Sequence, residues 1–267
     1  MKNAFATWKW SLTVVARSPA VVLALGVIAA LWGFGAYQWL WLPESSLLLL
    51  IVALLWAIVL IAVAVGVMAG TAATASRATA TAATRLYVRS LIGFDRRQFG
   101  RALGMFAAAA ILILILHTLF SRADDYALEV ASFLTFHSEK AVSPEDVGRV
   151  FWVVECIVWI VVGGFLLSLF IIVQSTGWRA AGRRALRTLA NCCWRAPFFT
   201  SLLSLAVFGG LPWLLSTWHP KAAMGFWDYA QMLVRMGISL VLVVGGWLFW
   251  LLSLARFNSP PADNTAQ

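Results

Sequence analysis

Six long apolar runs constrain this chain more than any other feature of its sequence. An α-helix needs about 20 mostly apolar residues to cross a hydrocarbon core of about 30 Å, and every run meets that requirement. The runs are 19–42, 47–70, 102–120, 150–173, 198–218 and 232–254. Hydrophobic residues make up 62% of the chain and charged residues only 12%, about half the charged share of a soluble domain. We therefore predict an all-α polytopic membrane protein with six transmembrane helices.

The connectors between the runs differ in charge in a regular way. Lysine and arginine dominate the N-terminal stretch, the connector after the second run and the connector after the fourth, whereas residues 121–149 carry six carboxylates against three basic side chains. Cytoplasmic connectors hold the excess of lysine and arginine. This pattern predicts a bacterial cytoplasmic (inner) membrane, with both termini cytoplasmic and the 121–149 loop outside. The net charge of +9 then describes one basic membrane face, and nucleic-acid binding is not expected because no polar domain is present.

Basic interfacial helices are expected on the cytoplasmic side. Arg179, Arg183 and Arg187 recur every four residues and share one helix face, and apolar residues cover an adjacent face. Such a helix lies in the membrane interface, where each well-placed arginine gains about 1 kcal/mol from anionic lipid. The arginines predicted to contact lipid phosphates are Arg17, Arg85, Arg89, Arg179, Arg183, Arg187 and Arg195.

The domain organisation is a single six-helix membrane domain over 1–257, followed by a disordered tail over 258–267. A weak repeat suggests three hairpin units, 1–70, 85–174 and 179–257, each with a basic lead-in; chance similarity between apolar segments is the alternative. Arg17-Ser18-Pro19 and Arg195-Ala196-Pro197 begin two of the units, and proline is well tolerated in the first turn of a helix. The middle lead-in, 85–101, lacks the proline.

This pattern of a basic lead-in, Arg-x-Pro at membrane entry and a helical hairpin resembles bacterial six-pass proteins. These include Yip1-like proteins and the membrane region attached to some glycerophosphodiester phosphodiesterases. The resemblance implies a six-helix membrane module with an accessory role. No soluble catalytic domain accompanies the module here, so the resemblance implies no phosphodiesterase activity.

Small residues recur at four-residue spacing in the second run. Ala62, Gly66 and Gly70 form a stripe of the kind that lets membrane helices approach closely. The stripe is consistent with packing inside the chain or with a seam between two chains.

The search for chemistry gives one candidate site. The sequence has no zinc-protease, nucleophile-elbow or phosphate-loop motif, so we expect no enzyme, no catalytic residues, no metal and no cofactor. His117, Glu155 and Arg235 lie inside their runs at similar depths, roughly 7–10 Å from the outer ends. Ionisable side chains at such depths usually pair or face a cavity. We predict a Glu155–Arg235 ion pair with His117 as a third member, acting as an outward-opening site or as a structural clasp, unless the side chains simply reach toward the interface.

Three functions fit these patterns. The preferred one is a non-enzymatic accessory or structural subunit of a membrane complex, acting through helix packing and anionic-lipid contacts, with a membrane-protein partner or a second copy of the chain. The first alternative is a small permease-like transporter that uses the His117, Glu155 and Arg235 cluster. The second is a pigment- or quinone-contacting subunit of an energy-converting complex, suggested by His117 and by tryptophans deep in the runs, namely Trp56, Trp159 and Trp247.

Overall fold

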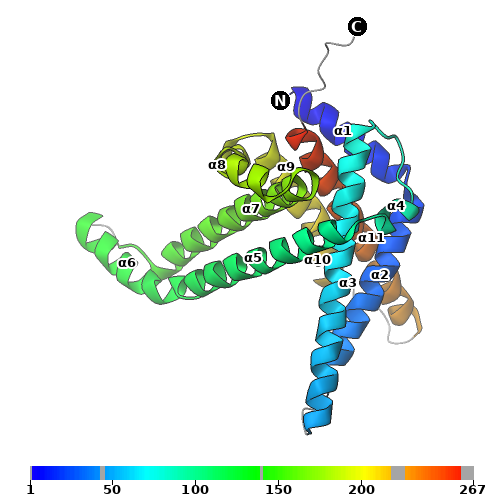
Figure 1. The fold of residues 1–267 in the computed structure, drawn as a ribbon. Helices are drawn as coiled ribbons and strands as arrows, with labels where there is room; N and C mark the ends of the chain where they lie inside the picture. The colour runs from blue at the N-terminus through cyan, green and yellow to red at the C-terminus, as the bar shows by residue number, and fades with distance from the viewer. Residues whose placement is uncertain (1, 43–45, 139–140, 218–225, 260–267) are drawn as a thin grey trace.

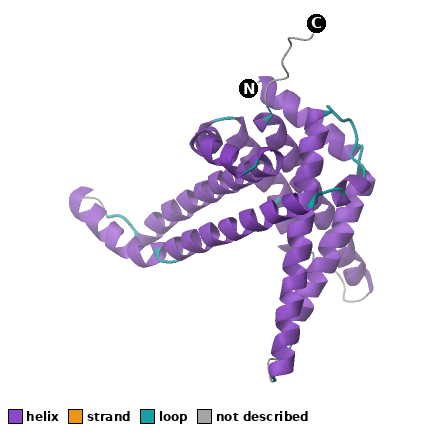
Figure 2. Ribbon diagram, in the orientation of Figure 1, coloured by secondary structure: helices purple, strands orange, loops and turns teal. Residues whose placement is uncertain are grey.

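The structure is a computed structural model that describes residues 2–42, 46–138, 141–217 and 226–259. Over these residues the chain forms eleven α-helices and no strand (Figures 1 and 2). The helices are α1 (Lys2–Ala16), α2 (Pro19–Leu40), α3 (Leu47–Ala80), α4 (Arg89–Ile92), α5 (Arg96–Phe120), α6 (Ala123–Ser138), α7 (Pro144–Thr176), α8 (Trp178–Trp194), α9 (Ala196–Phe208), α10 (Gly210–Thr217) and α11 (Phe226–Asn258). The predicted tail lies mostly at 260–267, outside the described residues.

Six helical segments are long and apolar enough to cross a membrane, as the sequence predicts. They are α2, α3, α5, α7, the α9–α10 pair and α11. The chain is therefore an all-α polytopic membrane protein. Several spans extend beyond their apolar runs. In α3, helix-favouring alanines continue the helix to Ala80. At the start of α7, the Ser143 hydroxyl accepts the Asp146 N–H at 3.1 Å and Pro144 occupies the first turn.

The fifth span is divided into two helices at Gly209. Pro212 stands four residues after Phe208 and has no N–H to donate to the Phe208 carbonyl. The helix therefore stops at Phe208 and restarts at Gly210. The break in the fifth span thus falls at Gly209, just before Gly210 and Pro212.

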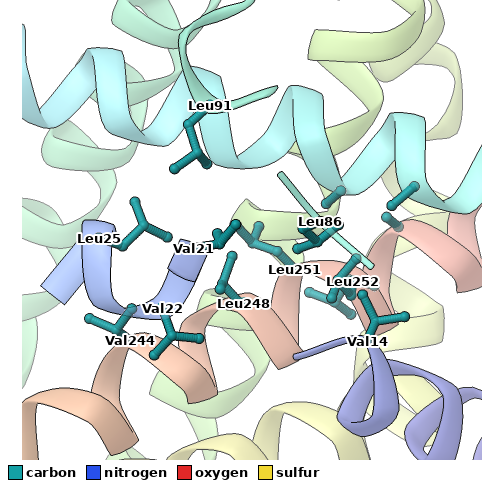
Figure 3. Packing of buried hydrophobic residues seen from close by; sticks show 14 of the residues in the cluster. Val14, Val21, Val22, Leu25, Leu86, Leu91, Val244, Leu248, Leu251 and Leu252 are labelled. Atoms are coloured by element: carbon teal, nitrogen blue, oxygen red, sulfur yellow. The ribbon is translucent and has the colours of Figure 1, made fainter. Parts of the chain in front are cut away.

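The helices pack tightly at one end of the molecule, which we call the packed end. It is the end at which α2, α5 and α9 begin and α3, α7 and α11 finish. Most of the buried residues of α3 lie within 69–78, most of those of α7 within 164–174, and all of those of α11 within 244–255. Figure 3 shows the largest cluster, in which Leu248, Leu251 and Leu252 of α11 meet Val14 of α1 and Val21 of α2. The core of the protein therefore lies in one half of the spans.

The other halves of the spans diverge toward what we call the open end. Figure 1 shows the α5–α6–α7 hairpin extending away from the α2–α3 hairpin. In the most apolar stretch of each span, 56% of the α11 residues are buried, but only 11% in α3 and 6% in α5. Consequently α11 is the central helix, and the open halves of α3 and α5 remain largely exposed, although each has a neighbouring helix on one side.

Tryptophan side chains tie α2 to α3 along the open half. Each of three indole N–H groups donates to a backbone carbonyl of the facing helix, and the bonds run in both directions across the hairpin. They are Trp32 to Leu60 at 2.8 Å, Trp39 to Ala53 at 2.8 Å and Trp56 to Gly35 at 2.9 Å. We call this set the tryptophan clasp. In hydrocarbon no water competes for these donors, so the clasp holds a hairpin that has little other tertiary support.

The basic lead-ins take two forms. α1 and α8 are continuous helices of 15 and 17 residues that precede α2 and α9. The middle lead-in at 85–101 is different: it holds only the four-residue α4, and Asp95 starts α5 at Arg96 through a capping box with Gln98. In the first and third predicted units a long basic helix is thus followed by two spans. The middle unit also has two spans, but it has no long lead-in helix.

Candidate functional site

The structure separates the three predicted members of the ionisable cluster. His117 and Glu155 lie toward the open end of the α5–α7 hairpin, whereas Arg235 lies toward the open end of α11. These two ends point in different directions in Figure 1. Among the described residues, Glu155 and Arg235 do not form an ion pair with each other, whereas Arg149 and Asp146 do, at 3.3 Å. Similar depth in the membrane did not predict proximity, because the spans diverge.

Each member of the cluster has its own local environment. The half-buried Glu155 accepts the indole N–H of Trp159 at 3.1 Å, and the Trp159 ring lies 6.4 Å from the ring of Phe120 on α5. Arg235 donates to the Gln231 side chain at 3.0 Å, one turn away on α11. His117 is exposed on α5. The Glu155–Trp159–Phe120 contacts therefore join the two helices of the hairpin near its open end.

The seven arginines predicted to meet lipid phosphate are all exposed. They belong to the α1–α2 elbow, the segment around α4, and α8 with the residue that follows it, and all of these lie at the packed end (Figure 1). Two other arginines at this end have structural partners. Arg77 donates to the carbonyls of Ser90 at 2.9 Å and Gly93 at 3.0 Å, and Arg101 donates to the Gln174 carbonyl at 3.1 Å.

The two Arg-x-Pro elbows differ in the bonds that their middle residue makes. At the α1–α2 elbow the buried Ser18 hydroxyl accepts the Leu86 N–H at 2.8 Å and donates to the Val14 carbonyl at 2.7 Å. The segment before α4 is therefore bonded to this elbow. At the α8–α9 elbow the corresponding residue is Ala196, which offers no hydroxyl.

A cavity of about 350 Å³ remains open beside the α8–α9 elbow, and we call it the elbow cavity. It is lined by Ala4, Phe5, Trp8, Trp194, Arg195, Ala196 and Phe199. Trp8 of α1 donates to the Thr200 hydroxyl at 2.7 Å, and that hydroxyl donates to the Ala196 carbonyl at 2.8 Å. The sequence analysis singles out Arg195 as a lipid-phosphate contact but not the aromatic rings beside it, since Phe5 and Trp8 come from the opposite end of the chain.

A second cavity, of about 290 Å³, lies between α2, α3 and α11 and is almost wholly apolar. Leu25, Trp32, Val67 and Trp247 are among the residues that line it. Trp247 donates to the Thr71 hydroxyl at 3.5 Å. The deep tryptophans that suggested a pigment thus each make a bond inside the chain: Trp56 to a carbonyl, Trp159 to Glu155 and Trp247 to Thr71.

The small-residue stripe of α3 faces the same chain at two of its three positions. A Cβ added at Gly70 would overlap the Leu91 carbonyl, and one added at Gly66 would meet the Phe94 ring at 3.7 Å. Ala62, further toward the open end, is exposed. Gly66 and Gly70 therefore serve contacts within this chain. Within the described part of the chain, no three His, Cys, Asp or Glu side chains gather in a way that would hold a metal ion.

Comparison with protein-family models, with curated proteins and with solved structures gives no match for this chain. The fold defines its class as a six-span, all-α membrane protein.

Proposed function

We propose that this protein is a non-enzymatic accessory or structural subunit of a complex in a bacterial cytoplasmic membrane. In this proposal the packed end lies at the cytoplasmic face and is held there by contacts between its arginines and anionic lipid. The open halves of α3 and α5 bind a membrane-protein partner or a second copy of the chain. The resemblance of the two Arg-x-Pro elbows to Yip1-like proteins and to the membrane region of glycerophosphodiester phosphodiesterases agrees with an accessory role.

The observation that supports this proposal best is the exposure of α5. Only 6% of its most apolar stretch is buried, and His117 is among the exposed residues. An ionisable side chain facing lipid is costly, and such residues usually face a protein interior or a polar partner. A partner helix packed on α5 would remove both His117 and the neighbouring apolar surface from lipid.

The structure favours neither alternative function. A transporter for polar solutes needs a polar cavity at His117, Glu155 and Arg235, but these side chains are separated and the cavity between α2, α3 and α11 is apolar. A pigment site needs free aromatic and imidazole groups converging on one cavity. Trp56, Trp159 and Trp247 instead lie on three different helices, α3, α7 and α11, and donate within the chain.

The proposal is tested by purifying the protein from its native host in a mild detergent. We expect a partner in fixed ratio by mass spectrometry and no visible absorbance. His117→Leu should lower the amount of partner retained. Thr118→Val is the matched control, because the Thr118 hydroxyl is already bonded to the Leu114 carbonyl of its own helix at 2.8 Å. A well-behaved, colourless chain that purifies alone and monomeric would overturn the proposal, and a co-purifying chromophore would support the pigment alternative instead.

A further inference from the structure

We propose that the elbow cavity binds the phosphate headgroup of one anionic phospholipid from the leaflet at the packed end. This inference deepens the proposed anchoring by anionic lipid, because it assigns one specific site in place of a diffuse basic surface. It rests on the shape and lining of the cavity, on the charge of the elements that build it, and on the exposure of its rim.

The charge around the cavity is of one sign. It is built by α1, by α8 and by the beginning of α9, and these three helices contain no aspartate or glutamate. Arg195 lies on the cavity wall and is exposed. A guanidinium on helices that carry no carboxylate is suited to a phosphate, which it can bind through two parallel N–H groups. The cavity is thus complementary to an anion.

The rest of the lining is suited to a lipid and not to a free anion. Four aromatic rings face the cavity, and Trp194 is 86% exposed, Phe5 61% and Phe199 44%. Aromatic rings of this kind are typical of the headgroup level of a membrane, where one side is apolar and the other is wet. They offer a surface for the glycerol and the first methylenes of the acyl chains, while Arg195 holds the phosphate.

The cavity is preformed by bonds that fix its wall. The chain of hydrogen bonds from Trp8 to Thr200 and on to the Ala196 carbonyl holds the Trp8 ring against α9. Thr200 is fully buried, so this contact between α1 and α9 is part of the core. A volume of about 350 Å³ is in the lower range of small-ligand sites, roughly 300–1,000 Å³. It suits a phosphate with its glycerol.

The contrast with the first elbow explains why only one such site is proposed. Both elbows have arginine two residues before a proline. At the first elbow, Ser18 binds the Leu86 N–H. A cavity of about 390 Å³ also lies beside that elbow, but it is apolar, and its lining includes Leu12, Ala16 and Pro19 and no arginine. At the second elbow Arg195 itself lines the cavity, and this guanidinium distinguishes the elbow cavity as a phosphate site.

The test uses the full-length protein, delipidated in mild detergent, and measures lipid binding by native mass spectrometry. Phosphatidylglycerol is the anionic probe and phosphatidylcholine the zwitterionic one. We expect one phosphatidylglycerol to bind at least tenfold more tightly than phosphatidylcholine. Arg195→Gln should weaken that binding at least fivefold, and Ala196→Leu, which fills the cavity and keeps the charge, should weaken it similarly. The control is Arg184→Gln on the exposed surface of α8, for which we expect less than a twofold change.

Three results would overturn the site. The first is binding of phosphatidylglycerol within twofold of the wild type in both Arg195→Gln and Ala196→Leu, with unchanged melting temperatures. The second is equal binding of the two lipids by the wild type. The third is binding of glycerol 3-phosphate as tightly as the lipid, which would assign the cavity to a soluble anion. The complex proposed above is judged separately, because partner retention in Arg195→Gln is measured in the native-host purification and does not depend on this cavity.

Discussion

Two adjacent cysteines near the end of α8 lie in different environments. Cys192 is 1% exposed and its sulfur is 3.9 Å from the Ser168 hydroxyl of α7, whereas Cys193 is only partly buried. Burial disfavours the thiolate and, with a smaller contribution from Cys193, raises the pKa of the Cys192 thiol from 9.0 to about 11. At pH 8 its thiolate fraction is therefore roughly a hundredfold below that of an unperturbed cysteine.

We predict that Cys193 is alkylated by iodoacetamide at least ten times faster than Cys192 at pH 8. Peptide mass spectrometry on the protein in mild detergent gives both rates. The difference should narrow as the pH rises through 11, where the Cys192 thiol ionises. Denaturation in sodium dodecyl sulfate is the control, because both thiols are then exposed and should react alike. Equal rates in mild detergent would contradict the buried position of Cys192.

Gly70 is the residue of the small-residue stripe at which no side chain fits. Because a Cβ there would overlap the Leu91 carbonyl, Gly70→Ala forces α3 away from the segment before α5, at a cost of about 1–3 kcal/mol. Gly66→Ala is the matched control on the same helix face: its Cβ meets the Phe94 ring at an ordinary 3.7 Å, and alanine favours helix. We expect a lower melting temperature for Gly70→Ala only, measured by tryptophan fluorescence. Equal changes in melting temperature for the two variants would show that the close approach of Gly70 to the Leu91 carbonyl does not contribute to stability.

At the scale of the element, the tryptophan clasp is the main tertiary support of the α2–α3 hairpin toward the open end. Replacing Trp32, Trp39 or Trp56 by phenylalanine keeps most of the apolar ring and removes one indole donor. Side-chain hydrogen bonds between membrane helices average about 0.6 kcal/mol, so each single variant should be mildly destabilised and the triple variant clearly so. Trp41→Phe is the control, since its ring is 70% exposed. Melting temperatures in detergent provide the comparison, and a triple variant as stable as Trp41→Phe would argue against the clasp.

Elements whose signals are local could be read from the sequence, and contacts set by packing could not. Arginine at every fourth position predicted the helix α8. The start of α7 at Ser143-Pro144 and the break before Pro212 in the fifth span likewise follow from local residue types. The separation of Glu155 from Arg235 was not predictable, because hydropathy fixes the depth of a residue along its span but not the direction in which the span leans. The elbow cavity was missed for a related reason: Phe5 and Phe199 are nearly two hundred positions apart and meet only through the packing of α1 on α9.

At the scale of the whole molecule, tight packing and positive charge occur at the same end. α1, the segment around α4 and α8 all lie at the packed end, and α6 in the acidic 121–149 segment lies at the open end (Figure 1). Short basic connectors are retained in the cytoplasm during insertion. We therefore expect the packed end to face the cytoplasm, so that the splayed halves of α3 and α5 occupy the outer leaflet.

This orientation predicts opposite accessibility for two exposed positions. In a variant whose three cysteines are replaced by alanine, Ser132→Cys on α6 should react with a membrane-impermeant maleimide in intact cells. Ala190→Cys on α8 should react only after the membrane is permeabilised. Both residues are exposed on their helices, so a failure to react reports the position of the membrane and not burial in the fold. Labelling of Ala190→Cys in intact cells, with Ser132→Cys protected, would invert the topology. It would also move the elbow cavity to the outer face, where the charge of the leaflet no longer favours an anionic headgroup, because the negative surface potential of anionic lipids belongs to the cytoplasmic leaflet.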